Sequence, residues 1–181
     1  MPELERIGPS LPAVARRAIQ QYLHGEGHLP DGPRALSGPR APVFVTLRAV
    51  DGALRGCVGS VTASQADVVS ETARSAVLAA TKDPRFPPVS TPELAELLIE
   101  VSVLAPEQPV SGPSELDPRR YGVIVRDGMG RQGLLLPGIP GIDEASVQVD
   151  VARRKAGIEP EAVVQLFRFE VKKWDDENAE R

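Results

Sequence analysis

Apolar and polar residues alternate along several short stretches of the chain, a pattern typical of β-strands with one buried face. Residues 43–50 and 54–61 form two such stretches. They are separated by Asp51-Gly52, the kind of dipeptide that most strongly favours a tight hairpin turn. A second hairpin and two further strands are predicted from the same pattern, at residues 121–136, 98–104 and 163–174.

In other stretches apolar residues recur every three or four positions, which indicates amphipathic helices. Ser10 is expected to cap the first helix. Ser90 and Glu93 have the spacing of a capping box at the start of a short helix. Asp143 is expected to cap the last helix, which continues through Ala156. The other predicted helices cover residues 11–23, 64–82 and 91–97.

The predicted strands arrive mainly as hairpins, and helices do not alternate strictly with them. This order favours an antiparallel α+β fold over a doubly wound parallel sheet. We therefore expect an α+β protein with a mainly antiparallel sheet and flanking helices. No repeat or linker divides the chain, so residues 10–175 are expected to form a single domain, with flexible ends at 1–9 and 176–181.

The composition of the chain argues against several classes of function. The 181 residues carry a net charge of −4, which disfavours a non-specific nucleic-acid coat because such a coat needs many cations. Cys57 is the only cysteine and there are two histidines, so a zinc site is not expected, nor is any other metal or cofactor indicated. The first residues lack the apolar core of a secretory signal, and no apolar stretch approaches the roughly 18 residues of a membrane span. The cytoplasm is the expected compartment.

The segment from Leu54 to Ser60 is the main candidate for a functional centre. In a strand, Arg55, Cys57 and Gly59 would share one face. Glycine weakens a strand unless another backbone, a bulge or a ligand must come close, and this segment also holds Gly56. Two interpretations remain open: a bulged hairpin with a buried structural cysteine, or a binding surface.

Cys57 is also a candidate nucleophile. A catalytic thiol needs a lowered pKa, normally from an imidazole or a helix N-terminus. The only histidines are His24 and His28, and their positions do not require contact with Cys57. Arg55 would lie on the same strand face and favour a thiolate. The alternative is a buried, unreactive cysteine.

The loop Asp83-Pro84-Arg85-Phe86-Pro87-Pro88 is a second candidate, because prolines can hold Arg85 and Phe86 outward as a recognition element. Alternatively, it is a rigid connection in which Phe86 covers the core. Glu100, in the middle of a predicted strand, would pair with an arginine across the sheet, face solvent or act as a general acid. Gly128-Met129-Gly130 lacks the strand-to-helix context of a phosphate-binding loop.

Taken in order, these segments resemble the AMMECR domain family, over about residues 11–169. The segments that carry the resemblance are Phe44-Val45-Thr46-Leu47, Leu54-Arg55-Gly56-Cys57-Val58-Gly59-Ser60, Asp83-Pro84-Arg85-Phe86-Pro87-Pro88, Ile99-Glu100-Val101-Ser102-Val103-Leu104, Gly133-Leu134-Leu135-Leu136-Pro137 and Lys155-Ala156-Gly157-Ile158.

The resemblance implies an α+β fold with a larger subdomain, formed from both chain ends, and a smaller one in the middle. It also implies an association, by gene neighbourhood or fusion, with Memo-type and radical SAM proteins, the AmmeMemoRadiSam system. Because no enzymatic activity is established for the family, it supplies no catalytic residues. The residues that we expect to form the site are Arg55, Gly56, Cys57, Gly59, Asp83, Arg85, Phe86 and Glu100.

Three features depart from the family pattern. Ile142 stands where an aromatic residue usually precedes the aspartate of the last helix, and Arg153 stands where a second cysteine is common. The loop at 137–143 is also shortened. A mechanism or metal site that needs two cysteines is therefore not expected here.

These observations lead to three hypotheses. The first is a non-catalytic binding or adaptor domain that uses the Arg55–Cys57 hairpin and the Arg85-Phe86 loop, with a small ligand or a partner protein as the bound species. The second is an enzyme with Cys57 as the nucleophile, assisted by Arg55 and Glu100. The third is a role related to nucleic acid, which the acidic balance disfavours.

Overall fold

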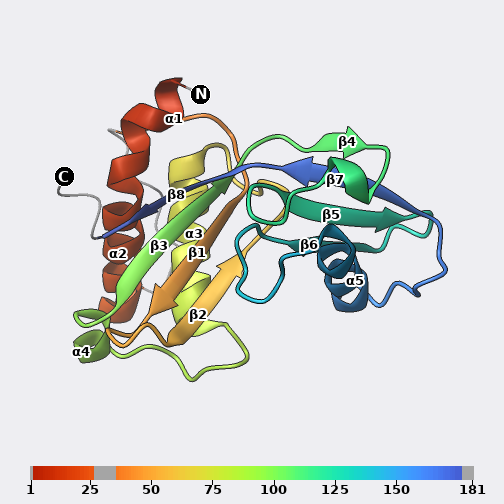
Figure 1. The fold of residues 1–181 in the computed structure, drawn as a ribbon. Coiled ribbons are helices and arrows are strands. Elements are labelled where there is room, and N and C mark those ends of the chain that lie inside the picture. Colours follow the sequence, from red (N-terminus) through yellow and green to blue (C-terminus); the bar gives the residue numbers. More distant parts are fainter. Residues whose placement is uncertain (1, 27–35, 177–181) are drawn as a thin grey trace. The chain divides into compact units, whose positions relative to one another are not determined.

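The computed structural model describes residues 2–26 and 36–176 (Figure 1). The chain divides into two compact units, unit 1 from Met1–Val103 with Lys172–Arg181, and unit 2 from Leu104–Val171. The fold is α+β with antiparallel sheets, as the hairpin pattern predicts. Among the described residues, no helix combines the length and apolar character that a bilayer crossing requires.

Sheet A belongs to unit 1 and has four strands. The predicted hairpin around Asp51-Gly52 is confirmed, and it places Thr46 opposite Cys57. On its other side Thr46 lies opposite Glu100. In spatial order the strands are β2 (Leu54–Gly59), β1 (Val43–Arg48), β3 (Leu98–Leu104) and β8 (Val171–Asp175).

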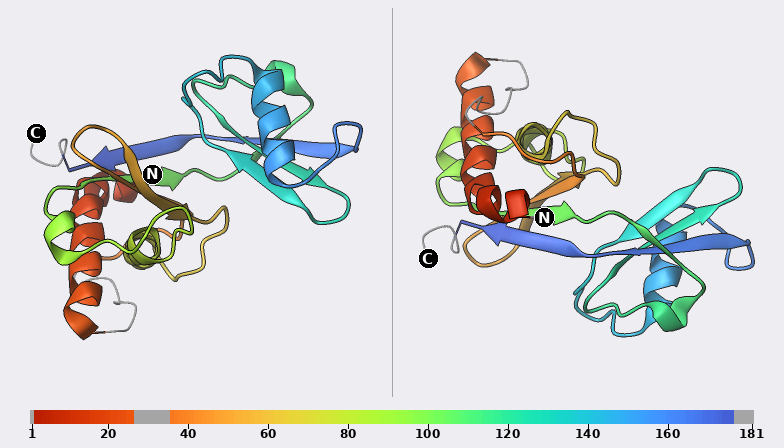
Figure 2. Two further views of the ribbon diagram at one scale, coloured as in Figure 1. Left: turned by 90° about the horizontal axis from the view of Figure 1, so that it is seen from below. Right: turned by 90° about the horizontal axis from the view of Figure 1, so that it is seen from above.

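Two helices, α2 (Leu11–Gln21) and α3 (Val68–Thr81), pack on one face of sheet A (Figure 2). Their apolar faces meet the inward side chains of β1 and β3 in an apolar core. Burial of this apolar surface is the main force that holds unit 1 together. Fully buried members of the core include Leu11, Ile19, Val45, Leu47, Ile99 and Val101.

Several helix boundaries differ from the predictions. α3 begins at Val68 rather than at Ser64, because the Asp67 side chain accepts hydrogen bonds from the first-turn amides and caps it there. Ser10 occupies the N-cap position of α2 but makes no side-chain cap, since a 3₁₀ turn, η1 (Gly8–Ser10), leads directly into the helix. α2 continues into η2 (Tyr22–Glu26). The predicted capping box of Ser90 and Glu93 is confirmed at α4 (Thr91–Leu94).

The expected flexible ends are also partly ordered. Pro2–Ile7 form α1, in which Leu4 and Ile7 are buried in the core of unit 1. Asp176 accepts hydrogen bonds from the Arg16 guanidinium and from the backbone N–H of Ile99. His28 lies outside the described residues.

Unit 2 contains sheet B and one longer helix, α5 (Ala145–Lys155), which packs on β5 and β6. Asp143 does not cap α5: Glu144 takes the N-cap position without a side-chain bond, and Asp143 pairs with Arg119 at 3.1 Å. A short 3₁₀ helix, η3 (Pro113–Glu115), follows β4. In spatial order the strands are β4 (Gln108–Val110), β7 (Val164–Phe169), β5 (Gly122–Asp127) and β6 (Gln132–Leu135).

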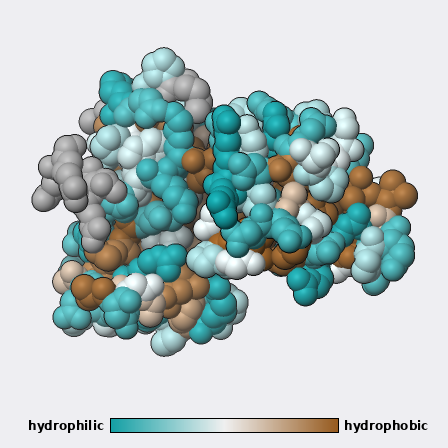
Figure 3. Space-filling view, in the orientation of Figure 1, coloured by the Kyte–Doolittle hydropathy of each residue, from teal (hydrophilic) through white to brown (hydrophobic). Residues whose placement is uncertain are grey.

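The predicted strand at 163–174 is two strands in two sheets. β7 belongs to sheet B, and β8, which starts after Glu170, belongs to sheet A. Hydrophilic and hydrophobic side chains are interspersed over most of the face in Figure 3. In unit 2 the most exposed large apolar side chains of the described residues are Met129 and Val163.

Candidate functional site

The free edge of strand β2 is covered by the loop that follows α3. Asp83 in this loop accepts a hydrogen bond from the backbone N–H of Cys57 through Oδ2, at 2.9 Å. The Arg85 guanidinium makes a longer contact of 3.5 Å to the Cys57 carbonyl. These side chains give Cys57 the hydrogen bonds that a neighbouring strand would supply, so the loop protects an otherwise open sheet edge.

Asp83 and Arg85 form a two-point ion pair inside the loop. Arg85 donates from Nε to Oδ1 of Asp83 at 2.9 Å and from Nη2 to Oδ2 at 2.7 Å. The Arg85 hydrogen bond outweighs the effect of burial and holds the pKa of the Asp83 carboxyl well below its usual range. Asp83 is therefore a carboxylate with a 3% exposed side chain, and Arg85 is fixed while its own side chain stays 53% exposed.

Arg55 makes a second ion pair, with Glu93 of α4. Its Nε donates to Oε1 of Glu93 and its Nη2 to Oε2, the latter at 3.1 Å. Burial raises the pKa of Glu93, but the hydrogen bonds from Arg55 and the Ser90 amide together lower it by more than burial raises it. The net shift of the pKa is therefore downward. Because the capping box already fixes Glu93 at the start of α4, Arg55 is held by a rigid partner.

Phe86 lies between these two ion pairs. The Arg55 and Arg85 guanidinium carbons lie 5.9 Å and 5.4 Å from the centre of its ring, within the range of cation–π attraction. Arg55 Nη1 is buried and has no hydrogen-bond partner among the described residues. Through the Phe86 ring and its loop, the two predicted motifs, the Arg55–Cys57 hairpin and the Arg85-Phe86 loop, lie next to each other. We call this group the β2-edge cluster, which consists of Arg55, Cys57, Asp83, Arg85 and Phe86.

The two glycines of β2 are explained by close packing of the protein itself. A Cβ on Gly56 would lie 2.4 Å from the carbonyl oxygen of Ala79 in α3. A Cβ on Gly59 would lie 2.4 Å from the ring of Phe44 and from the Val43 carbonyl oxygen. What approaches the strand here is therefore the backbone of α3 and the neighbouring strand β1.

Cys57 is partly buried, and the Thr46 hydroxyl donates a hydrogen bond to its Sγ at 3.4 Å. Among residues 2–26 and 36–176 no imidazole or carboxylate is hydrogen-bonded to this sulfur. His24 belongs to η2, at the far end of α2 from its N-cap. The same described ranges hold no group of three His, Cys, Asp or Glu side chains placed to bind a metal ion.

Glu100 lies apart from the β2-edge cluster. It is on β3, and Thr46 of β1 stands between it and Cys57. Its partner across the sheet is a lysine rather than an arginine, since Lys173 Nζ lies 3.3 Å from Oε1 of Glu100. The sequence pattern does not identify Glu93 as the partner of Arg55. It predicts the capping-box position of Glu93, but nothing in the local pattern indicates a contact across 38 residues.

The chain is similar over most of its length to a known protein family and to a solved structure. The AMMECR1 family model matches residues 12–174. A protein of Thermotoga maritima is 44% identical over 164 residues, which cover 88% of this chain and 94% of that protein. The crystal structure of the uncharacterized protein PH0010 from Pyrococcus horikoshii superposes with a TM-score of 0.81 at 33% identity, covering 92% of this chain and 90% of that chain.

Protein CA_C1420 of Clostridium acetobutylicum is 36% identical over 163 residues. That match covers 87% of this chain but only 34% of the Clostridium protein, so the same domain also occurs within a longer chain. The family model spans nearly the whole of both units, and the Thermotoga and Pyrococcus relatives are matched along most of their length. The chain belongs to the AMMECR1 family.

Proposed function

We propose that the chain is a cytoplasmic binding domain that acts as an adaptor, with the β2-edge cluster as its contact surface. The observation that carries the proposal is the state of Arg85. The guanidinium is held by the two hydrogen bonds that it donates to Asp83, yet about half of the side chain remains exposed beside the Phe86 ring. A fixed arginine next to an aromatic ring loses little entropy on binding, and such residues often dominate binding energy.

The partners we propose are the Memo-type and radical SAM proteins with which the family resemblance associates this domain. The occurrence of a related domain within a longer Clostridium protein supports a role in which the domain works next to other protein modules. The pairing of charges in and beside the cluster also supports binding rather than catalysis, because Asp83 and Glu93 both serve as partners of arginines.

The test is co-purification of the tagged chain with a Memo-type and a radical SAM protein from the same genome. We expect Arg85→Ala and Phe86→Ala each to weaken the complex by about tenfold or more, because each removes one side of the contact surface. Arg119→Ala is the matched control, since Arg119 is an exposed, paired arginine of unit 2. Equal binding by the wild type and both cluster variants, with unchanged melting temperatures, would contradict the proposal.

A second candidate is an enzyme in which Cys57 is the nucleophile. The hydrogen bond from the Thr46 hydroxyl to Sγ favours this alternative, because it fixes the position of the sulfur. The rate of alkylation of Cys57 by iodoacetamide, followed against pH, separates the two functions. An adaptor is expected to react no faster than free cysteine and to tolerate Cys57→Ser in the co-purification assay. A nucleophile is expected to react faster at neutral pH.

A further inference from the structure

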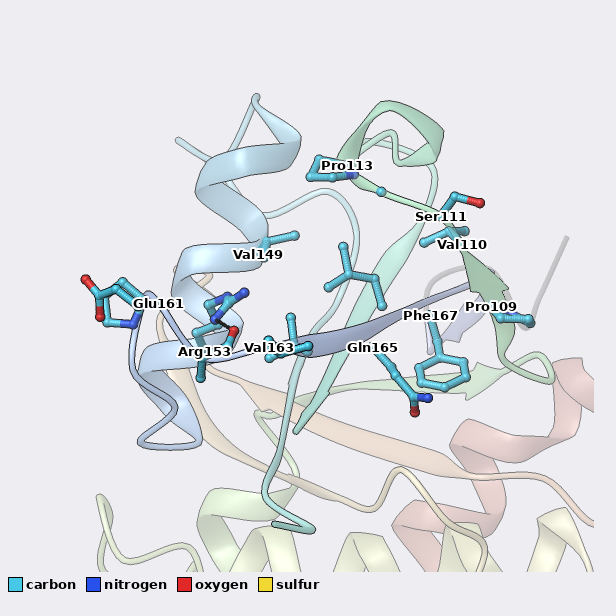
Figure 4. A pocket seen from close by; sticks show the side chains of 15 residues that line it. Pro109, Val110, Ser111, Pro113, Val149, Arg153, Glu161, Val163, Gln165 and Phe167 are labelled. Atoms are coloured by element: carbon cyan, nitrogen blue, oxygen red, sulfur yellow. Dashed lines mark hydrogen bonds between the residues drawn. The ribbon is translucent and has the colours of Figure 1, made fainter. Parts of the chain in front are cut away.

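A groove lies on the part of sheet B that no described helix covers. α5 packs over β5 and β6. On the same face of sheet B, α5 does not cover the neighbouring strands β4 and β7. The groove has a volume of about 750 Å³ and is bounded by α5, by β4 with the start of η3, and by the segment that leads into β7 (Figure 4). This volume lies within the usual range for small-molecule sites.

The floor of the groove is apolar. Val110 of β4 lies opposite Leu166 of β7, and Val164 follows on the same face of β7. All three side chains are only partly buried, and Val149 of α5 adds an apolar wall. Surface of this kind gains free energy when an apolar ligand removes it from water.

One guanidinium supplies positive charge at the groove. Arg153 of α5 donates from Nη1 to the carbonyl oxygens of Glu159 and Ala162, at 2.9 Å and 3.0 Å, which fixes the side chain. The Arg153 side chain makes no other hydrogen bond among the described residues, so the N–H groups of Nε and Nη2 stay free to donate. Figure 4 shows the Glu161 carboxylate turned to the outer side of the groove, away from its floor.

We propose that this groove binds a small apolar carboxylate, with the tail on Val110, Val164 and Leu166 and the carboxylate on Arg153. An arginine with two free donors matches the two oxygens of a carboxylate, and an already fixed side chain loses little freedom on binding. The site belongs to unit 2 alone. It goes beyond the adaptor function and does not depend on it.

The test is a titration of the ¹⁵N-labelled full chain with octanoate, and separately with octan-1-ol, which has the same tail without the charge. We expect octanoate to shift amides within 109–113, 149–153 and 160–167, and to bind about tenfold more tightly than octanol. Arg153→Gln should remove this preference for octanoate and leave the affinity for octanol nearly unchanged. Arg154→Gln is the matched control, because Arg154 is the exposed neighbour that does not line the groove.

A second variant keeps the proposal testable if loss of Arg153 loosens the segment at 159–162. Val110→Trp fills the floor and leaves Arg153 in place, so both octanoate and octanol should lose affinity. Equal affinities for the two ligands in the wild type, or octanoate shifts confined to other residues, would overturn the proposal. Tighter binding, by about tenfold, of an acetylated peptide with an apolar C-terminal residue would assign the groove to protein C-termini instead.

Discussion

At the scale of single residues, strand β2 is held from two directions. Gly56 lets the backbone of α3 come against one face of the strand, and Asp83 binds the N–H of Cys57 at its edge. Both contacts involve backbone atoms that cannot move without shifting a whole element. The stability of the segment therefore depends on the absence of a side chain at Gly56 and on the buried Asp83 carboxylate more than on the Cys57 thiol.

Gly56→Ala is expected to destabilise the protein by about 1–3 kcal/mol, because the added Cβ would meet the Ala79 carbonyl oxygen at 2.4 Å and either the helix or the strand must shift. The free energy of unfolding in urea measures the loss. Gly112→Ala is the control, since its Cβ would meet nothing within 4 Å and its backbone is extended. The control should change stability by less than about 0.5 kcal/mol. Similar losses in both variants would argue against close packing at Gly56.

Asp83→Asn is expected to cost about 2 kcal/mol near neutral pH, because the variant loses the charged partner of Arg85. The folded-state pKa of Asp83 is depressed. Its stabilisation is therefore fully present above the unfolded-state pKa of about 4, and it is lost as the pH falls towards the folded-state value. Urea unfolding at about pH 7 and at about pH 3 should show the gap between wild type and variant closing in acid.

Glu96→Gln is the matched control for that experiment, because it removes an exposed carboxylate of unit 1 that makes no side-chain hydrogen bond among the described residues. It should change stability by less than about 0.5 kcal/mol at either pH. A gap for Asp83→Asn that stays constant between the two pH values would show that its charge does not contribute to stability.

At the scale of elements, the 83–88 loop takes the place of a strand beside β2. Loss of the Asp83 acceptor at this edge should let β2 open locally, while the centre of sheet A stays closed. In Asp83→Ala we expect the Cys57 amide to exchange with solvent deuterium at least about tenfold faster, while the Val45 amide of the central strand β1 keeps its rate. Equal acceleration at both amides would indicate global destabilisation instead. Asp83→Asn retains an acceptor oxygen and should give an intermediate rate.

The elements that the sequence predicts well are those set by local pattern. The Asp51-Gly52 hairpin and the Ser90 capping box depend on neighbouring residues, and both are present as predicted. β4 escaped prediction because it is short and contains Pro109, which disfavours a strand. The break at Glu170 escaped because the alternation of apolar residues continues through it, while the chain passes from one sheet to the other.

The β2-edge cluster is likewise predicted only as far as local sequence patterns determine it. Its motifs are recognisable one by one in the sequence. Cys57 and Asp83, however, are 26 residues apart and meet only because α3 crosses the sheet and returns the chain to the edge of β2. The partner of Arg55 is also set by this long-range topology. Sequence alone could suggest that the glycines mark a close approach, but it could not identify α3 as the element that approaches.

At the scale of the whole molecule, unit 2 is inserted between two strands of unit 1. The chain leaves β3 and returns to β8, and the Ala105 N–H binds the Glu170 carbonyl at 2.9 Å where the two paths run side by side. Unit 2 has its own apolar core between α5 and sheet B. A unit with its own core and adjacent ends is able to fold alone.

We therefore expect residues 104–171, produced as a separate polypeptide, to melt cooperatively and to give dispersed amide resonances. Circular dichroism and ¹H–¹⁵N spectra provide the measurement. The matched control is residues 104–163, which lacks β7 and so loses the strand between β4 and β5. The control should be unfolded. A random-coil spectrum for the longer fragment would show that unit 2 depends on unit 1 for its stability.

The insertion also sets the order in which mechanical force would reach the two units. The described segments nearest the two termini, α1 and β8, both belong to unit 1, where Glu5 pairs with Lys172. Tension applied through the chain ends is therefore borne first by the contacts of β8 with the rest of unit 1. Unit 2 experiences no load until β8 has been pulled from the edge of sheet A. A protease with an unfolding motor that pulls from the C-terminal side would therefore detach β8 first. It would then have to unfold an intact unit 2.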